Sequence, residues 1–285
     1  MDNQCYPCLV SAGLNAACLA TEDQTLVGEI IRNVLAELAV ADPKTPPPLI
    51  ARFVQETVAR VTGVDDPYGP LKKTCNDMAL DLYPELLALK ASAGNRRARF
   101  DTGVRLAIAG NIIDFGVSAH VGKKLVTDTI SHSLKTSVHG SIETFYRAVD
   151  KAENILWLAD NAGEIVFDRL LLEEMDLSKV IYAVRGKPVI NDAVMEDARA
   201  AGLTSMVKVV DSGTNIPGTL VDYCSNAFKS VFHKADLIIV KGQGNFETLD
   251  HGDPRTWFLF KAKCSVVARY AGCNIGDLVV KQGGI

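Results

Sequence analysis

Hydrophobic positions in the first hundred residues recur at the three- and four-residue spacing of amphipathic helices. This spacing predicts helical segments at 9–19, 23–40, 49–61 and 71–91. A run of three prolines at 46–48 and the turn at 66–70 separate them. We therefore expect an amino-terminal all-helical unit, residues 1–103, that caps or flanks the rest of the chain.

After residue 103 the pattern changes to short apolar, β-branched runs that alternate with helical stretches. Strands are predicted at 154–159, 179–184, 206–210, 236–240, 257–260 and 277–281, with helices at 162–174, 192–201, 218–234 and 264–271. Such alternation is typical of right-handed βαβ units. Residues 104–285 should form an α/β domain, a doubly wound and mainly parallel sheet flanked by helices.

Composition and charge narrow the class of protein. The 285 residues are 48% hydrophobic and carry a net charge of −4 without a long basic block. This argues against nucleic acid or an anionic membrane as partner and favours a small molecule. No apolar run reaches the length of a membrane span, and the start at Met1 lacks the basic, apolar pattern of a signal peptide. We expect a cytoplasmic protein; the pattern leaves its oligomeric state open.

Polar clusters follow four of the predicted strands directly. They are Asp160-Asn161, the segment 185–192 that ends in Asp192, Asp211-Ser212-Gly213, and Lys241-Gly242-Gln243-Gly244-Asn245. Because the carboxyl ends of parallel strands share one edge of a sheet, these clusters should meet in one crevice.

The residue types in this crevice indicate phosphoryl chemistry. Asp160, Asn161 and Asp192 supply hard oxygen ligands suited to Mg²⁺ or Mn²⁺. Lys241, the loop 242–245 and the helix start at 162–164, which includes Gly163 and Glu164, would offer positive charge and backbone N–H groups to a phosphate.

Other interpretations fit parts of the same pattern. Asn161 and Glu164 have the spacing of a capping box, Asp192 could be a helix N-cap, and Asp211 could form a turn. Lys241 could equally be a solvated surface charge.

Competing functions use the same crevice. A non-catalytic metal- or nucleotide-binding protein would fit it. A nicotinamide-dependent oxidoreductase fits less well, because Glu247 stands where a dinucleotide loop needs its third glycine. Asn161 and Ala162 after Asp160 leave no Asp-x-Asp motif, which counts against an aspartyl-phosphate intermediate.

Seven cysteines include a Cys5-x-x-Cys8 pair near the amino terminus. No second close pair completes a zinc site, and no strand precedes residue 5 as in a redox motif. We expect free thiols, with a bound metal as the less favoured alternative.

Taken together, the motifs resemble the prokaryotic branch of the metal-dependent damage-control phosphatases, the ARMT-like family formerly called domain of unknown function eighty-nine. The resemblance rests on motifs that occur in this order: Cys5-x-x-Cys8, Asp66-Pro67-Tyr68 with Lys72, Gly110-Asn111-x-x-Asp114, Asp160-Asn161-x-Gly163-Glu164, Asn191-Asp192, Asp211-Ser212-Gly213 with Pro217-Gly218, and Lys241 to Asn245.

The resemblance implies hydrolysis of small phosphomonoesters, such as sugar phosphates or damaged metabolites, by metal-activated water. Mg²⁺, Mn²⁺, Co²⁺ or Ni²⁺ would support activity, and Asp160, Asn161 and Asp192 would hold the metal. The implied catalytic residues are Asp160, Asp211 and Lys241, with Asp114 as a further candidate for acid or base. The implied substrate contacts are Asn111, Asp114, Gly163, Glu164, Ser212, Gly213, Lys241, Gly242, Gly244 and Asn245.

Overall fold

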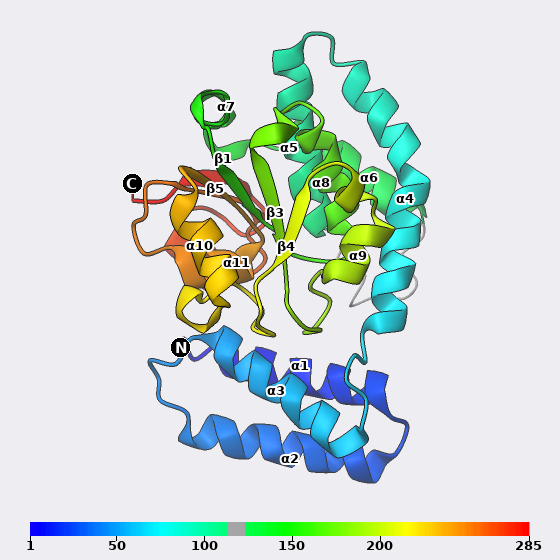
Figure 1. The fold of residues 1–285 in the computed structure, drawn as a ribbon. Helices are drawn as coiled ribbons and strands as arrows, with labels where there is room; N and C mark the ends of the chain where they lie inside the picture. Colours follow the sequence, from blue (N-terminus) through cyan, green and yellow to red (C-terminus); the bar gives the residue numbers. More distant parts are fainter. Residues whose placement is uncertain (113–122, 285) are drawn as a thin grey trace.

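The computed structural model describes residues 1–112 and 123–284, and it shows a central sheet with helices on both faces and a separate layer of helices below (Figure 1). Asp114 lies outside the described residues. The helices are α1 (Cys5–Ala20), α2 (Gln24–Val40), α3 (Pro47–Thr62), α4 (Gly69–Ala91), α5 (Arg96–Ile112), α6 (Lys123–Lys135), α7 (Ile142–Lys151), α8 (Glu164–Leu172), α9 (Met195–Ala200), α10 (Asn226–Lys234), α11 (Gln243–Leu249) and α12 (Ser265–Ala271). Three short 3₁₀ turns occur at Leu177–Lys179, Leu203–Ser205 and Val221–Tyr223.

The seven described strands form one sheet with the order β1-β7-β6-β5-β2-β3-β4. They are β1 (Val138–Gly140), β2 (Ile155–Leu158), β3 (Val180–Val184), β4 (Lys208–Asp211), β5 (Leu237–Lys241), β6 (Thr256–Lys261) and β7 (Leu278–Gln282). Only the β6–β7 pair is antiparallel among these strands. This confirms the expected α/β fold. The order reverses between β2 and β5, and such a switch point opens a crevice at the carboxyl ends of the strands.

Side chains alternate across the sheet and so build two cores. Ile155 and Trp157 of β2 face a cluster that also contains residues of α4, α5 and α8. Leu156 and Leu158 face a cluster with residues of α10, α11 and α12. Each fully buried apolar side chain of this size contributes about 1.5–3 kcal/mol. Strand β2 is therefore fixed on both faces, and the loop that follows it starts from a rigid position.

Helices α1, α2 and α3 pack around a core of their own, in which Ile30, Val34 and Val54 are fully buried. Ile190, from the loop after β3, packs against this core with a φ of 45°. By contrast, α4 and α5 contribute to the core beneath the sheet. The helical unit is present as expected, but packing changes near Leu71, which touches both cores, and not at residue 103.

Several predicted boundaries differ from the structure. The expected helix 218–234 begins only at Asn226, because Gly218 has a φ of 100° and the Thr219 N–H bonds to Thr248 Oγ1 instead of a helical carbonyl. The expected loop 242–245 contains the first turn of α11. Strand β1 and helix α11 were not predicted, since both are too short to show a clear period.

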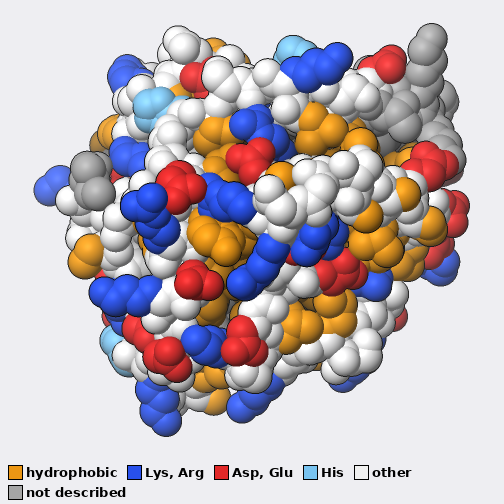
Figure 2. All heavy atoms as spheres, turned by 90° about the horizontal axis from the view of Figure 1, so that it is seen from above, with side chains coloured by type: hydrophobic (Ala, Val, Ile, Leu, Met, Phe, Trp, Pro, Cys, Tyr) orange, Lys and Arg blue, Asp and Glu red, His pale blue; other side chains and the backbone are white. Residues whose placement is uncertain are grey.

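The face at the end of the sheet away from α1–α3 carries intermixed basic and acidic side chains around an apolar hollow (Figure 2). Among the helices of the described ranges, none is both long and apolar enough to cross a membrane.

Candidate active site

The loops after β2 and β3 lie side by side at the switch point. The Ala162 N–H donates to Asn191 O (2.9 Å), and the Ala193 N–H donates to Asp160 O (2.8 Å). These bonds form an antiparallel bridge between Asn161 and Asp192. The three residues predicted to hold a metal therefore come together on paired backbones.

Asn161 does not cap helix α8, so the capping-box interpretation is wrong. The N-cap is Gly163, whose φ is 79°. The Asn161 amide instead donates to Asp160 Oδ2 (2.9 Å) and Glu164 Oε2 (3.3 Å). Its side chain belongs to the polar cluster of the crevice.

Asn76 of α4 holds the start of α8 from the other side. Its Oδ1 accepts the Gly163 N–H (2.7 Å), while its Nδ2 donates to Asp197 Oδ1 (2.8 Å). The Gly163 backbone donor is thus already bonded within the protein, which leaves it less suited to the substrate contact predicted for it.

Asn111, near the end of α5, lies over the same cluster. Its Nδ2 donates to Asp160 Oδ2 (2.6 Å) and Glu164 Oε2 (2.8 Å). Its Oδ1 is buried and has no hydrogen-bond partner in the described structure. An orphaned buried acceptor beside two carboxyl groups indicates room for a donor or a cation.

Lys241 is completely buried and bonded within the protein. Its ammonium contacts Glu164 Oε1 (2.6 Å), Asp168 Oδ1 (2.5 Å) and Ala107 O (2.9 Å). Burial alone would lower the pKa of Lys241, but Asp168 and Glu164 outweigh it and raise the pKa. The geometry corrects two predictions: Lys241 is neither a solvated surface charge nor open to a phosphate in this structure.

Asp168 is the second buried partner of this lysine. Trp157 Nε1 (3.1 Å) and Tyr182 Oη (2.6 Å) both donate to its Oδ2. Burial raises the pKa of Asp168 to about 6, although Lys241 acts in the opposite direction. Glu164, held by Lys241 and two amides, likewise belongs to this internal network and is only 1% exposed.

Asp160 and Asp192 are the two carboxyl groups on the crevice loops. Burial, followed by the charges of Glu164 and Asp192, raises the pKa of Asp160 well above its usual value. Burial also raises the pKa of Asp192, but the adjacent Arg185 opposes that rise. Asp160 keeps partial exposure to solvent, so it is the carboxyl group that a ligand in the crevice would meet.

The cluster carries more negative than positive groups. Its members in hydrogen-bond contact are the carboxyl groups of Asp160, Glu164, Asp168 and Asp192 and the cations of Lys241 and Arg185. Within residues 1–112 and 123–284, no group of three or more His, Cys, Asp or Glu side chains is arranged to hold a metal ion. The predicted metal ligands are the carboxyl groups of Asp160 and Asp192 and the amide of Asn161, so they do not make up such a group of three.

The segment after β5 approaches Asp160 closely. Gly242 has a φ of 77°, and a Cβ there would lie 1.9 Å from Asp160 Oδ2. Asn245 is fully buried, and its Nδ2 donates to Ala159 O (3.0 Å) and Lys241 O (2.8 Å). The structure gives Asn245 a positioning role in place of the predicted substrate contact. Gly244 lies in the first turn of α11.

The segment after β4 is a turn at the sheet edge. Asp211 Oδ1 accepts the Gly213 N–H (2.9 Å), which matches the turn-forming interpretation. Ser212 is buried, and its hydroxyl bonds to the backbone of Thr214. Gly213 lies against Gly186, and a Cβ added to Gly186 would lie 2.6 Å from the backbone of Gly213. Among the described residues, no hydrogen bond or ion pair joins Asp211 to Asp160, so the catalytic role of Asp211 stays a prediction.

Three residues of the site were not assigned roles from the sequence. Asp168 follows Glu164 by four residues on a mostly apolar helix, and that spacing could have revealed it. Arg185 ends a buried strand beside the predicted crevice, which is also a signal. Asn76 lies inside a long helix, and the sequence gives no signal of its role.

Among the described residues, none of the seven cysteines forms a disulfide. Cys5 and Cys264 line a cavity of about 300 Å³, and burial raises the pKa of Cys5 and Cys8. A raised pKa disfavours the thiolate that metals and disulfide exchange require.

Comparison with known proteins identifies the family of this chain. The profile of the damage-control phosphatase ARMT1-like domain matches residues 1–279. Damage-control phosphatase PH1575 of Pyrococcus horikoshii is 33% identical over 97% of this chain and 96% of its own length. The damage-control phosphatase of Archaeoglobus fulgidus is 33% identical, with 97% of both chains covered.

A solved structure gives the same result for the fold. The crystal structure of PH1575, described as a DUF89 family protein, superposes with a TM-score of 0.88 at 32% identity and covers 99% of each chain. The match extends over the helical unit as well as the sheet. This chain therefore belongs to the family of ARMT1-like damage-control phosphatase domains.

Proposed function

We propose that this protein is a divalent-metal-dependent phosphatase that hydrolyses small phosphomonoesters, such as sugar phosphates or damaged phosphometabolites. The family and two relatives named damage-control phosphatase support the reaction class. The observation that carries the proposal is the position of Asp160. Its partly exposed carboxyl group lies at the switch point of the sheet, beside Asp192, and is bonded by amide donors.

The residues present fit a divalent cation. The cluster has excess negative charge, its oxygen donors are of the type that Mg²⁺ and Mn²⁺ prefer, and Asn111 contributes a buried acceptor without a partner. Asp160, Asn161 and Asp192 would hold the ion. When bound, such a cation neutralises phosphoryl oxygens and makes water a stronger nucleophile at neutral pH.

The protein's own groups would orient the ester. Lys263 is exposed, and its positive charge lowers the pKa of Asp160 more than the charge of Arg185 does. Its charge therefore acts on the space around the Asp160 carboxyl group. The backbone N–H of Lys263 already donates to Gln243 Oε1 (3.2 Å), so it is the side chain that would contact the ester. Lys241 would act through Glu164, by holding that carboxyl group in place near Asp160. Charge placed in advance around a transferring phosphoryl group is the main source of catalysis in such sites.

The test is phosphate release from an aryl phosphate and a panel of sugar phosphates, with and without Mg²⁺, Mn²⁺, Co²⁺ or Ni²⁺. Asp160→Asn should abolish metal-dependent release, while Asp253→Asn, a carboxylate paired with Arg255 near the opposite end of the strands, should not. If no metal supports release, or if Asp160→Asn is fully active, the proposal is wrong. Thermal stabilisation by metal without turnover would instead favour a binding protein.

A further inference from the structure

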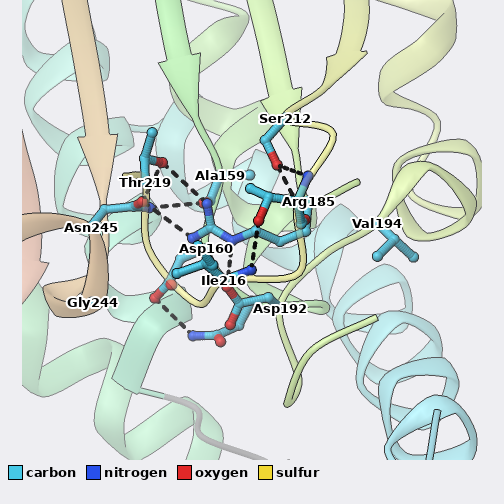
Figure 3. Close-up of polar contacts among 12 residues, drawn as sticks. Ala159, Asp160, Arg185, Asp192, Val194, Ser212, Ile216, Thr219, Gly244 and Asn245 are labelled. Atoms are coloured by element: carbon cyan, nitrogen blue, oxygen red, sulfur yellow. Dashed lines mark hydrogen bonds and ion pairs between the residues drawn. The ribbon is translucent and has the colours of Figure 1, made fainter. Parts of the chain in front are cut away.

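Arg185 is a buried cation that lies just after β3 and contacts Asp192, Thr219 and Asn245, which come from three different segments (Figure 3). Its Nε donates to Asp192 Oδ2 (2.6 Å), its Nη1 to Thr219 Oγ1 (3.2 Å) and its Nη2 to Asn245 Oδ1 (3.2 Å). Every nitrogen of the guanidinium is thus bonded within the protein. With 4% of the residue exposed, Arg185 is largely shielded from a substrate.

Asn245 connects this guanidinium to the other side of the crevice. Its Oδ1 also accepts from Thr219 Oγ1 (2.8 Å), and its Nδ2 donates to Ala159 O (3.0 Å). Ala159 directly precedes Asp160. A continuous chain of hydrogen bonds therefore runs from the carboxyl group of Asp192, through Arg185 and Asn245, to the backbone that carries Asp160.

We propose that Arg185 is a positioning residue of this site, which orients the carboxyl group of Asp192 beside the loop that carries Asp160 so that both can hold a divalent cation. The proposal rests on the proposed function, because it concerns the same two carboxylates. Without Arg185, Asp192 would keep its backbone bridge to Asn161 but would lose the hydrogen bond that orients its side chain.

The guanidinium suits this task better than an ammonium group. Its planar fork can reach Asp192, Thr219 and Asn245 at once, whereas a lysine carries a point charge on a flexible stem. Groups that orient metal ligands typically change metal affinity by about 10–100-fold when they are removed. Arg185→Lys should therefore restore part, but not all, of the function that Arg185→Gln removes.

The experiment is titration of the metal-free protein with Mn²⁺ alone, followed by calorimetry, with urea unfolding to confirm that each variant is folded. Arg185→Gln should weaken Mn²⁺ binding by about 10–100-fold, Arg185→Lys by less, and Thr219→Val, which removes one contact of the guanidinium, by a few-fold. The matched control is Arg255→Gln, an arginine paired with Asp253 near the other end of the sheet, which should bind Mn²⁺ like the native protein.

In phosphate release, Arg185→Gln should raise the Mn²⁺ concentration needed for half-maximal rate more than it lowers the rate at saturating Mn²⁺. Native affinity in the folded Arg185→Gln protein would overturn the proposal. If that variant does not fold, native affinity in both Arg185→Lys and Thr219→Val would overturn it equally. Failure of the native protein itself to bind Mn²⁺ would refute the proposed function, and the positioning role with it.

Discussion

Replacing Lys241 with methionine tests how the buried charges of the crevice support the fold. Methionine keeps most of the apolar stem and removes the ammonium group. Two carboxyl groups, Glu164 and Asp168, are then left without the cation that lies 2.6 and 2.5 Å from them. All three side chains are 0% exposed, so water cannot take its place.

Removing one partner of a buried ion pair typically costs about 3–5 kcal/mol. For Lys241→Met this corresponds to a roughly 10²- to 10⁴-fold fall in the ratio of folded to unfolded protein. Lys90→Met is the matched control, because Lys90 is also buried and ion-paired, but one of its partners, Glu173, is 31% exposed. We expect a smaller loss of unfolding free energy for Lys90→Met and unchanged phosphate release.

The loss of unfolding free energy in Lys241→Met should depend on pH in a defined direction. Lys241 lowers the pKa of Asp168, which is about 6 in the native protein, so its removal raises that pKa further. A carboxyl group with a higher pKa in the folded than in the unfolded state binds protons more tightly when folded, so stability falls as pH rises through the folded pKa. The loss of unfolding free energy in Lys241→Met, relative to the native protein, should therefore be larger at about pH 8 than at about pH 5.

Urea unfolding followed by circular dichroism at both pH values measures the deficit. A loss below about 1 kcal/mol at the higher pH would refute the reasoning, since it would place Lys241 in contact with solvent. An equal loss at both pH values would refute it as well, because the stranded carboxyl groups could not then be the cause.

Three further substitutions test separate contacts. Gly242→Ala places a Cβ 1.9 Å from Asp160 Oδ2, so metal-dependent phosphate release should fall by about 100-fold; a native rate would contradict this. Lys263→Ala should raise the KM for the phosphoester several-fold and leave urea unfolding unchanged, and an unaltered KM would exclude Lys263 from substrate binding. Asn76→Ala leaves a buried Gly163 N–H without its acceptor and should cost about 1–3 kcal/mol in urea unfolding; no loss would show that water replaces the amide.

The fold could be predicted well because its signals are local. The apolar run of β2 is followed at once by the amphipathic pattern of α8, and that alternation repeats through β3 and β5. Parallel order then places Asp160 and Asp192 at one edge without further information. The sequence pattern could not place α4 and α5, since an amphipathic helix does not reveal which core its apolar face will join.

The roles of individual polar residues were harder to predict. Lys241 and Asn245 lie in the segment where a phosphate loop was expected, yet both side chains turn inward. Their direction depends on the alternation of β5 and on where α11 begins, and a one-residue shift would have exposed different groups. Arg185 was visible at a strand end, but its partners Thr219 and Asn245 are 34 and 60 residues away.

Ile190 gives the helical unit a thermodynamic connection to the crevice. Its side chain packs against the core of α1, α2 and α3, and Asp192 lies two residues further along the same loop. A ligand that orders this loop would also stabilise the packing of Ile190 on the helical unit, and that packing would favour the ligand by the same free energy. Changes on the far side of α1, α2 and α3 that loosen their core would thus tune affinity at Asp192 without altering any residue of the crevice.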